Sequence, residues 1–162
     1  MQILVKNKDT LLYDEFKFKC CVGKNGVSYN KKEGDKKTPK GTYFLGPVYY
    51  RSDRIPKFET KLKKIKIKKN MGWSDDENSR FYNKLIKIKK NIKHEKLYQK
   101  GTNYDLLIPI KYNMIKTKKN KGSAIFLHLT NNYKKTLGCI ALKKKDMFIL
   151  LKIINNKTKI KI

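Results

Sequence analysis

The sequence is poor in the residues that build several common kinds of site. Among its 162 residues are two histidines, His94 and His128, and three cysteines, Cys20, Cys21 and Cys139. An odd number of cysteines, two of them adjacent, does not indicate a disulfide framework. The lack of any paired Cys-x-x-Cys spacing argues against a zinc site. We therefore expect no metal and no cofactor.

Long hydrophobic runs are also missing. The chain has no stretch of about 18 apolar residues, which excludes a membrane-spanning helix. Its first residues, MQILVKNKDTLLYDEF, lack the continuous apolar core and small-residue cleavage site of a signal peptide. We expect that this chain carries no signal peptide. Either the protein is not exported by that route, or its leader is missing from the sequence.

Negative charge is scarce. The sequence has 13 Asp and Glu against 41 Lys and Arg, which gives a net charge of +28. Such an excess favours a polyanionic partner. However, only three of the cations are arginine, the side chain that phosphate and base recognition favours. The lysines are also spread from end to end, so we expect no specific nucleic-acid partner. A basic protein that binds nucleic acid or another polyanion without catalysis is the alternative hypothesis.

The apolar content is sufficient for a folded core. Hydrophobic residues make up 39% of the chain and aromatic residues 11%. A chain of this length can bury a core without disulfides. We find no internal repeat. We therefore expect one domain over residues 1–162, and a monomer.

The pattern along the chain predicts mostly β structure. Short apolar or alternating segments are separated by turn residues such as Asn, Asp and Gly. Pro109 places its strand at an edge or a bulge. Helical spacing of apolar residues predicts two peripheral helices, at 79–86 with Ser79 as its cap and at 144–155. The expected strands are 2–5, 11–13, 16–22, 42–45, 48–51, 62–68, 104–113, 122–129 and 157–162.

One pair of residues in this pattern indicates chemistry. In the segment 122–129, Ala124, Phe126 and His128 alternate with apolar residues on the other face, which predicts a strand inside layered sheets. Cys139 follows His128 by eleven residues, where the chain re-enters an apolar strand. Because sequential strands commonly pair, the loop between them should bring Cys139 beside His128. An imidazole near a thiol can accept its proton and form the nucleophilic thiolate.

The glycine before the cysteine supports this interpretation. Gly138 allows backbone angles that are closed to other residues. The main-chain N–H groups of Gly138 and Cys139 are therefore candidates for an oxyanion hole. Thr136 can form a local hydrogen bond that fixes the turn. A Cys–His dyad with a main-chain oxyanion hole is equipped for acyl transfer.

At these residues the sequence resembles a known family. HLTNNYKKTLGCIAL, residues 128–142, is similar to the signature of L,D-transpeptidase catalytic domains of the YkuD type. EGDKKTPKGTYFL resembles the early Thr-Pro-x-Gly hairpin of that family, and GWSDDENSRFYNKLI, YDLLIPIKYN and GSAIFLH resemble further blocks in the same order. The resemblance extends from about Phe16 to the C-terminus. It implies a mainly β fold, an L,D-transpeptidase-like sandwich or barrel with one or two peripheral helices.

The resemblance also implies an activity. Cys139 would be the nucleophile and His128 the general base, later acid, in acyl transfer on peptidoglycan stem peptides that cross-links or remodels the cell wall. An L,D-carboxypeptidase acting on the same stems is the alternative. The location implied is the bacterial cell envelope or periplasm. We expect Arg51, Arg54 and the lysines near Lys134 to steer the carboxylates of the substrate.

Two positions depart from the usual family pattern. Leu137 stands where many members have histidine, and Ala141 stands where many have Asn or Arg. In the subgroup that GSAIFLH resembles, Thr-x-Gly-Cys followed by small and apolar residues is familiar. We therefore do not interpret either departure as loss of activity.

Overall fold

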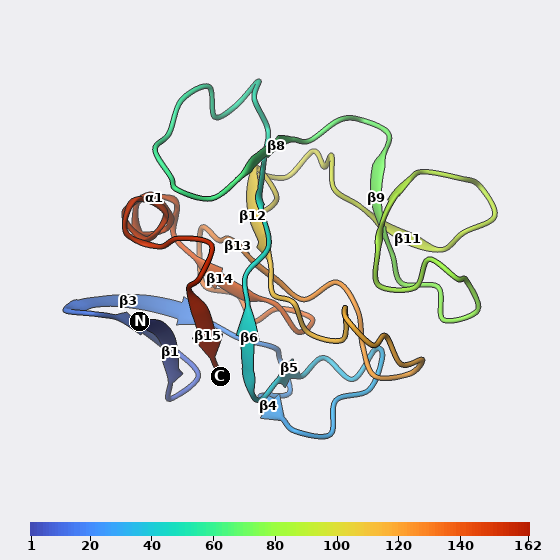
Figure 1. Ribbon diagram of the computed structural model, residues 1–162, viewed down its shortest axis with the longest axis horizontal. Helices are drawn as coiled ribbons and strands as arrows, with labels where there is room; N and C mark the ends of the chain where they lie inside the picture. Colours follow the sequence, from blue (N-terminus) through green and yellow to red (C-terminus); the bar gives the residue numbers. More distant parts are fainter.

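The structure, a computed structural model, describes residues 1–162 and consists mainly of β-strands (Figure 1). This confirms the predicted fold class. The one helix, α1, spans Lys144–Ile153. The strands are β1 Gln2–Lys6, β2 Thr10–Tyr13, β3 Phe16–Cys21, β4 Val27–Ser28, β5 Thr38–Pro39, β6 Thr42–Phe44, β7 Val48–Tyr50, β8 Lys64–Lys66, β9 Met71–Ser74, β10 Leu85–Lys87, β11 His94–Lys96, β12 Leu106–Pro109, β13 Phe126–Leu129, β14 Ile140–Leu142 and β15 Lys159–Lys161.

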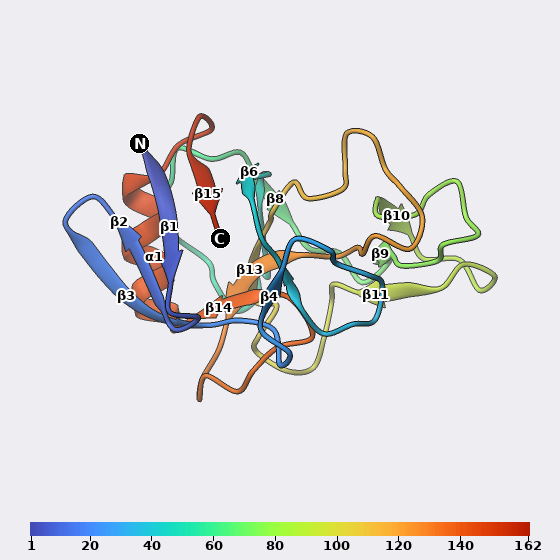
Figure 2. The same ribbon diagram turned by 90° about the horizontal axis from the view of Figure 1, so that it is seen from below.

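Ten strands form one large curled sheet in the order β6-β15-β1-β2-β3-β14-β13-β12-β7-β8. Strand β14 is the junction, because it pairs with β3 on one side and with β13 on the other. A separate three-stranded sheet, β10-β9-β11, lies at the opposite end of the molecule from α1 (Figures 1 and 2). Strands β4 and β5 form a short parallel pair. The structure contains no helix with the length and hydrophobicity of a membrane span.

Helix α1 forms where the apolar spacing predicts it, within two residues at its C-terminal end. Met147, Leu150 and Leu151 are fully buried on one face and belong to the larger hydrophobic core. Asp146 lies in the first turn and Lys152 in the last turn. Both charges interact favourably with the helix dipole. Packing of the apolar face is therefore supported by the charges at the two ends.

The prediction of a helix at 79–86 is wrong. The hydroxyl of Ser79 accepts the N–H of Phe81, which favours a local turn over a helix. Asn83 has φ 57°, a left-handed conformation that ends helical geometry. Its carboxamide oxygen accepts the indole N–H of Trp73 at 3.0 Å. These contacts turn the chain back, so that β10 pairs with β9 instead.

The expectation for Pro109 also needs correction. Strand β12 is an interior strand, paired with β13 on one side and with β7 on the other. Pro109 is its last residue, and its carbonyl accepts the N–H of Gly46 at 2.7 Å. Proline is accommodated here because it ends the strand, where loss of one donor interrupts little of the ladder.

The central strands separate two hydrophobic cores. In β13 and the residue before it, Ile125, Leu127 and Leu129 belong to the larger core, which also contains α1. Phe126 belongs to a smaller core of eight buried residues. The predicted two-sided burial of this segment is confirmed, although the regular strand begins only at Phe126. The smaller core consists of Tyr49, Ile67, Trp73, Leu97, Tyr104, Leu107, Phe126 and Cys139.

Candidate active site

The register of two neighbouring strands brings His128 and Cys139 to one cleft. Strands β13 and β14 are parallel, and His128 pairs with Ala141, two residues after Cys139. Both side chains line a cleft of about 990 Å³. They are largely buried, with 6% of His128 and 8% of Cys139 exposed. Cys139 therefore lines the cleft and at the same time packs in the smaller hydrophobic core.

The turn before Cys139 is fixed by Thr136. Its hydroxyl donates to the carbonyl oxygen of Cys139 at 2.6 Å and accepts the N–H of Gly138 at 3.1 Å. Gly138 has φ +143°, and a Cβ added there would lie 3.0 Å from the carbonyl oxygen of Lys37. Both the backbone angle and the close approach require glycine at this position. Thr136 therefore has the local hydrogen bonds expected from the sequence.

The two N–H groups expected to form an oxyanion hole differ in their bonding. The N–H of Gly138 is already used by the hydroxyl of Thr136. The N–H of Cys139 has no hydrogen-bond partner within the chain. Of the two, only the N–H of Cys139 is free to meet an incoming oxygen without breaking the turn.

The sulfur of Cys139 is held by main-chain groups. The N–H of Phe126 donates to Sγ at 3.3 Å, and the thiol donates to the carbonyl oxygen of Ala124 at 3.3 Å. No hydrogen bond joins the sulfur to His128 in this state. Burial, and next the negative charge of Glu95, raise the pKa of the Cys139 thiol to about 12. The resting thiol is therefore protonated at neutral pH.

The imidazole of His128 is oriented by its own strand. Its Nδ1 lies 2.8 Å from the carbonyl oxygen of Leu129. Because a carbonyl oxygen only accepts, Nδ1 carries the hydrogen and Nε2 carries the lone pair. Burial lowers the pKa of His128 to about 4, although the Leu129 carbonyl opposes this shift. At neutral pH His128 is therefore a neutral imidazole, oriented by a main-chain carbonyl and not by an acidic residue.

Two residues beside this pair, Tyr104 and Glu95, were not predicted from the sequence. The ring of Tyr104 lies edge-on to that of His128, with 5.3 Å between centroids. Its hydroxyl donates to Glu95 Oε1 at 2.6 Å, and burial raises the pKa of Glu95. Both residues line the cleft. Glu95 lies in β11, outside the family-like blocks, and Tyr104 begins the block YDLLIPIKYN just before β12, where the pattern indicated only a strand.

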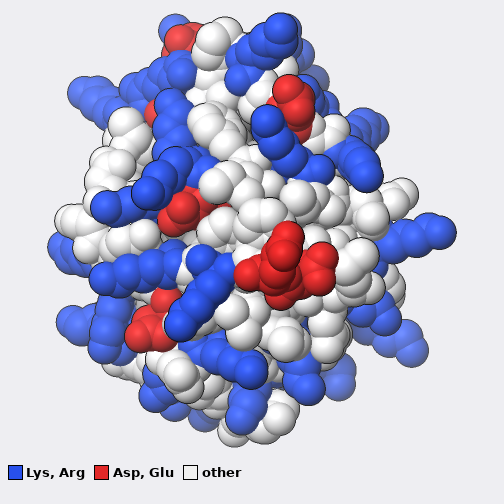
Figure 3. Space-filling view, turned by 90° about the vertical axis from the view of Figure 1, so that its left-hand side faces the viewer, with Lys and Arg blue, Asp and Glu red and all other residues white.

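The cleft has charges of both signs. Its acidic members are Glu33, Asp75, Glu77 and Glu95, and its basic members are Lys31, Lys36, Lys93, Lys134 and Lys135. One carboxylate oxygen of Asp75 and one of Glu77 are buried without a hydrogen-bond partner. On the face that carries α1 and β3, Lys and Arg cover the surface broadly, with acidic groups between them (Figure 3).

The structure does not bring Arg51 and Arg54 to the cleft. Arg51 is 3% exposed, and its guanidinium donates to both carboxylate oxygens of Asp53, at 2.8 and 2.7 Å. Arg54 pairs with Asp105 at 2.8 Å. Neither arginine is among the residues that line the cleft. Their charges are used to hold loops together, which corrects the expectation that they steer substrate. Lys134, in contrast, does line the cleft.

Comparisons with known proteins agree with this architecture. Residues 2–162 match the family described as YkuD, L,D-transpeptidase catalytic domain. The solved structure of Bd1075 from Bdellovibrio bacteriovorus is similar in fold, with a TM-score of 0.53 and 17% sequence identity. The match covers 99% of this chain and 46% of that one, so the chain spans about half the length of that relative. Comparison with curated proteins gave no match. The family match covers nearly every residue. The chain therefore belongs to the YkuD family of L,D-transpeptidase catalytic domains, a family of enzymes that act on peptidoglycan.

Proposed function

We propose that this protein is a cysteine-dependent acyltransferase that acts on the stem peptides of peptidoglycan. The observation that carries the proposal is that Cys139, immediately before β14, and His128, in the adjacent parallel strand β13, line one cleft in a chain of this family. The site works in the cell envelope, where the substrate polymer is found.

The reaction begins from a neutral thiol and a neutral imidazole. Cys139 Sγ attacks the carbonyl carbon that joins the third, diamino residue of a stem to its terminal D-amino acid. The proton of the thiol passes to Nε2 of His128 as the C–S bond forms. The N–H of Cys139 donates to the oxygen that becomes negative. Proton transfer accompanies attack because the resting thiol is not ionised.

The intermediate collapses when the C–N bond breaks. His128 gives its proton to the departing amine, and a thioester on Cys139 remains. An amine of a second stem then attacks the thioester and loses its proton to His128, and the sulfur regains a proton as it leaves. If water attacks instead, the product is a shortened stem, and the enzyme is an L,D-carboxypeptidase.

Charges of both signs in the cleft support this class of substrate. A stem peptide carries carboxylates and the free amine of its diamino residue. The acidic groups Glu33, Asp75 and Glu77 complement the amine, and the basic groups Lys134 and Lys135 complement the carboxylates. The cleft of about 990 Å³ has room for an extended peptide.

The test is incubation with tetrapeptide stems, followed by intact-mass spectrometry. The expected result is an acyl adduct on Cys139, release of the terminal D-amino acid, and either a cross-linked or a shortened product. Cys139→Ala should abolish the adduct and the turnover while stem binding survives. Turnover that persists in Cys139→Ala would overturn the proposal. Binding that falls steeply with salt, with no turnover by the unmodified protein, would favour the polyanion-binding alternative.

A further inference from the structure

A buried lysine lies against the turn that presents the nucleophile. Lys31 is 3% exposed, and a charged side chain is rarely buried unless it is paired. Its side chain passes between two glycines. A Cβ on Gly122 would lie 2.8 Å from Lys31 Cε, and a Cβ on Gly138 would lie 3.8 Å from Lys31 Nζ. The ammonium group is therefore adjacent to the residue that precedes Cys139, and Lys31 also lines the cleft.

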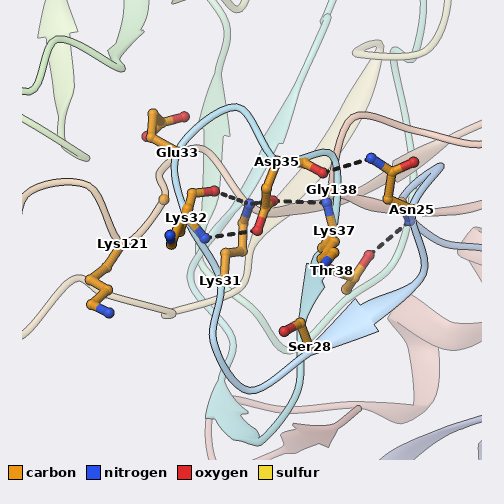
Figure 4. Close-up of polar contacts among 12 residues, drawn as sticks. Asn25, Ser28, Lys31, Lys32, Glu33, Asp35, Lys37, Thr38, Lys121 and Gly138 are labelled. Atoms are coloured by element: carbon orange, nitrogen blue, oxygen red, sulfur yellow. Dashed lines mark hydrogen bonds and ion pairs between the residues drawn. The ribbon is translucent and has the colours of Figure 1, made fainter.

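The loop of residues 31–37 holds this ammonium in place. Lys31 Nζ donates to Asp35 Oδ1 at 2.6 Å and to the carbonyl oxygen of Lys32 at 3.1 Å. The same carboxylate accepts the main-chain N–H groups of Lys32 and Lys37, at 2.7 and 2.9 Å. Figure 4 shows Lys31 and Asp35 turned toward each other, with the main chains of Lys32 and Lys37 bonded to the same carboxylate. Asp35 thus fixes both the loop and the position of the charge.

This arrangement leaves one donor of the ammonium unused. An ammonium has three N–H bonds, and two of those of Lys31 have partners within the chain. Buried donors almost always have an acceptor, so a buried ammonium with a free N–H at a cleft wall points to an acceptor that binds there. The N–H of Gly138 is occupied by Thr136, so the site otherwise offers only the N–H of Cys139 for a developing oxyanion.

We propose that Lys31 stabilises the negative charge that develops at the Gly138–Cys139 turn during the reaction, first on the sulfur and then on the oxyanion. Asp35 is the positioning residue that aims Lys31 at this turn. The inference rests on the proposed function for the oxyanion, whereas the effect on the sulfur is independent of any substrate. The positive charge of Lys31 already acts against the rise in the pKa of Cys139.

The test compares Lys31→Gln with the unmodified protein in two assays. Alkylation of Cys139 by iodoacetamide, read at its own peptide by mass spectrometry, should slow about tenfold at a fixed pH, because a rise of one unit in the thiol pKa lowers the thiolate fraction about tenfold. Turnover of tetrapeptide stems should fall about 100-fold in kcat with KM changed less than about threefold, as for loss of an oxyanion donor. Lys31→Arg, which keeps the charge, should retain most of both rates.

Lys32→Met is the matched control. Lys32 is exposed in the same loop, and only its main chain takes part in the bonds to Lys31 and Asp35. The Lys32→Met variant loses one positive charge, as Lys31→Gln does. Its rates of alkylation and of stem turnover should stay within about twofold of those of the unmodified protein. Equal alkylation rates and equal kcat for Lys31→Gln and the unmodified protein would overturn the inference. So would a result in which Lys31→Gln and Lys31→Met both fail to fold while Lys31→Arg folds, because Lys31 would then only support the loop.

The two assays separate this inference from the proposed function. If the unmodified protein does not process stems, the proposed function fails, and the alkylation rates still decide whether Lys31 stabilises charge on Cys139. If stems are processed and Lys31→Gln changes neither assay, the function stands and the role of Lys31 is refuted.

Discussion

Tyr104 donates a hydrogen bond of 2.6 Å to Glu95 at the wall of the cleft that contains Cys139. Tyr104 and Cys139 also pack in the same small core. The two partners act on the thiol in opposite directions, because the charge of Glu95 raises the pKa of Cys139 whereas the hydroxyl of Tyr104 lowers it. Glu95, which accepts the hydrogen bond of the Tyr104 hydroxyl, thus favours the protonated form of the Cys139 thiol.

Substitution of these two residues should therefore move the reactivity of Cys139 in opposite directions. Glu95→Gln removes a negative charge and should speed alkylation of Cys139 at a fixed pH, by about threefold to tenfold. Tyr104→Phe removes the hydroxyl that lowers the pKa of Cys139 and should slow alkylation by a similar factor. The measurement is the pH dependence of iodoacetamide alkylation at the Cys139 peptide. A shift of both variants in the same direction would show a packing effect and contradict this account.

Cys139 in the unmodified, unliganded protein should react slowly at neutral pH. Burial, and next the charge of Glu95, raise its thiol pKa to about 12. At pH values below 12, the thiolate fraction therefore rises about tenfold for each unit by which the pH increases. Alkylation followed from pH 7 to 10 should show this slope without a plateau. Cys20, whose thiol pKa burial also raises to about 12, is an internal comparison in the same sample. Rapid alkylation of Cys139 at pH 7 would mean that the resting pair is ionised.

Acid should destabilise the fold through His128. Its pKa is 6.5 in the unfolded chain, and burial lowers it to about 4 in the folded protein. The unfolded state therefore binds a proton more readily between these values, and stability falls as the pH drops from 6.5 toward 4. The full effect is about 3 kcal/mol. Urea unfolding at pH 7.0, 6.0 and 5.0 measures it, and His128→Gln should flatten the curve. An equal slope in both proteins would assign the effect to other groups.

Gly138→Ala should be costly. The residue has φ +143°, and an added Cβ would lie 3.0 Å from the carbonyl oxygen of Lys37 and 3.3 Å from Ile125 Cδ1. We expect a loss of about 1–3 kcal/mol in the free energy of unfolding and a strong loss of turnover, because the turn that presents Cys139 must shift. Gly101→Ala is the control, since nothing lies within 4 Å of its added Cβ. It should change stability by less than about 1 kcal/mol.

Arg51→Met should lower the free energy of unfolding and leave substrate binding unchanged. Arg51 holds Asp53 with two hydrogen bonds, donates to the carbonyl of Gln99 at 2.8 Å and stacks on Tyr98. Removal of this partly buried network should cost about 1–3 kcal/mol of unfolding free energy. The KM for stems should stay within about twofold when measured well below the unfolding temperature. Arg80→Met, at an exposed arginine, is the control. A large rise in KM for Arg51→Met would restore the steering role.

Local patterns in the sequence were sufficient to predict the central strand β13 and the helix α1. The alternation in 125–129 predicted which side chains face each core, since side chains of a strand point to opposite faces in turn. The spacing of Met147, Leu150 and Leu151 likewise predicted the buried face of α1. The same kind of reasoning failed at 79–86, where the side-chain bonds of Asn83 to distant residues decided the backbone.

The sequence by itself determined the mainly β class, the family resemblance and the placement of His128 and Cys139 at one cleft, because each depends on residue types at short spacing. Only the tertiary structure decided the rest of the site. Lys31, Glu95 and Tyr104 come from three separate segments, and no spacing along the chain encodes their approach to Cys139. The charge states also depend on burial, which folding creates. Removal from water keeps both Cys139 and His128 neutral. Arg51, which the sequence suggested as a substrate contact, is buried and binds Asp53 instead.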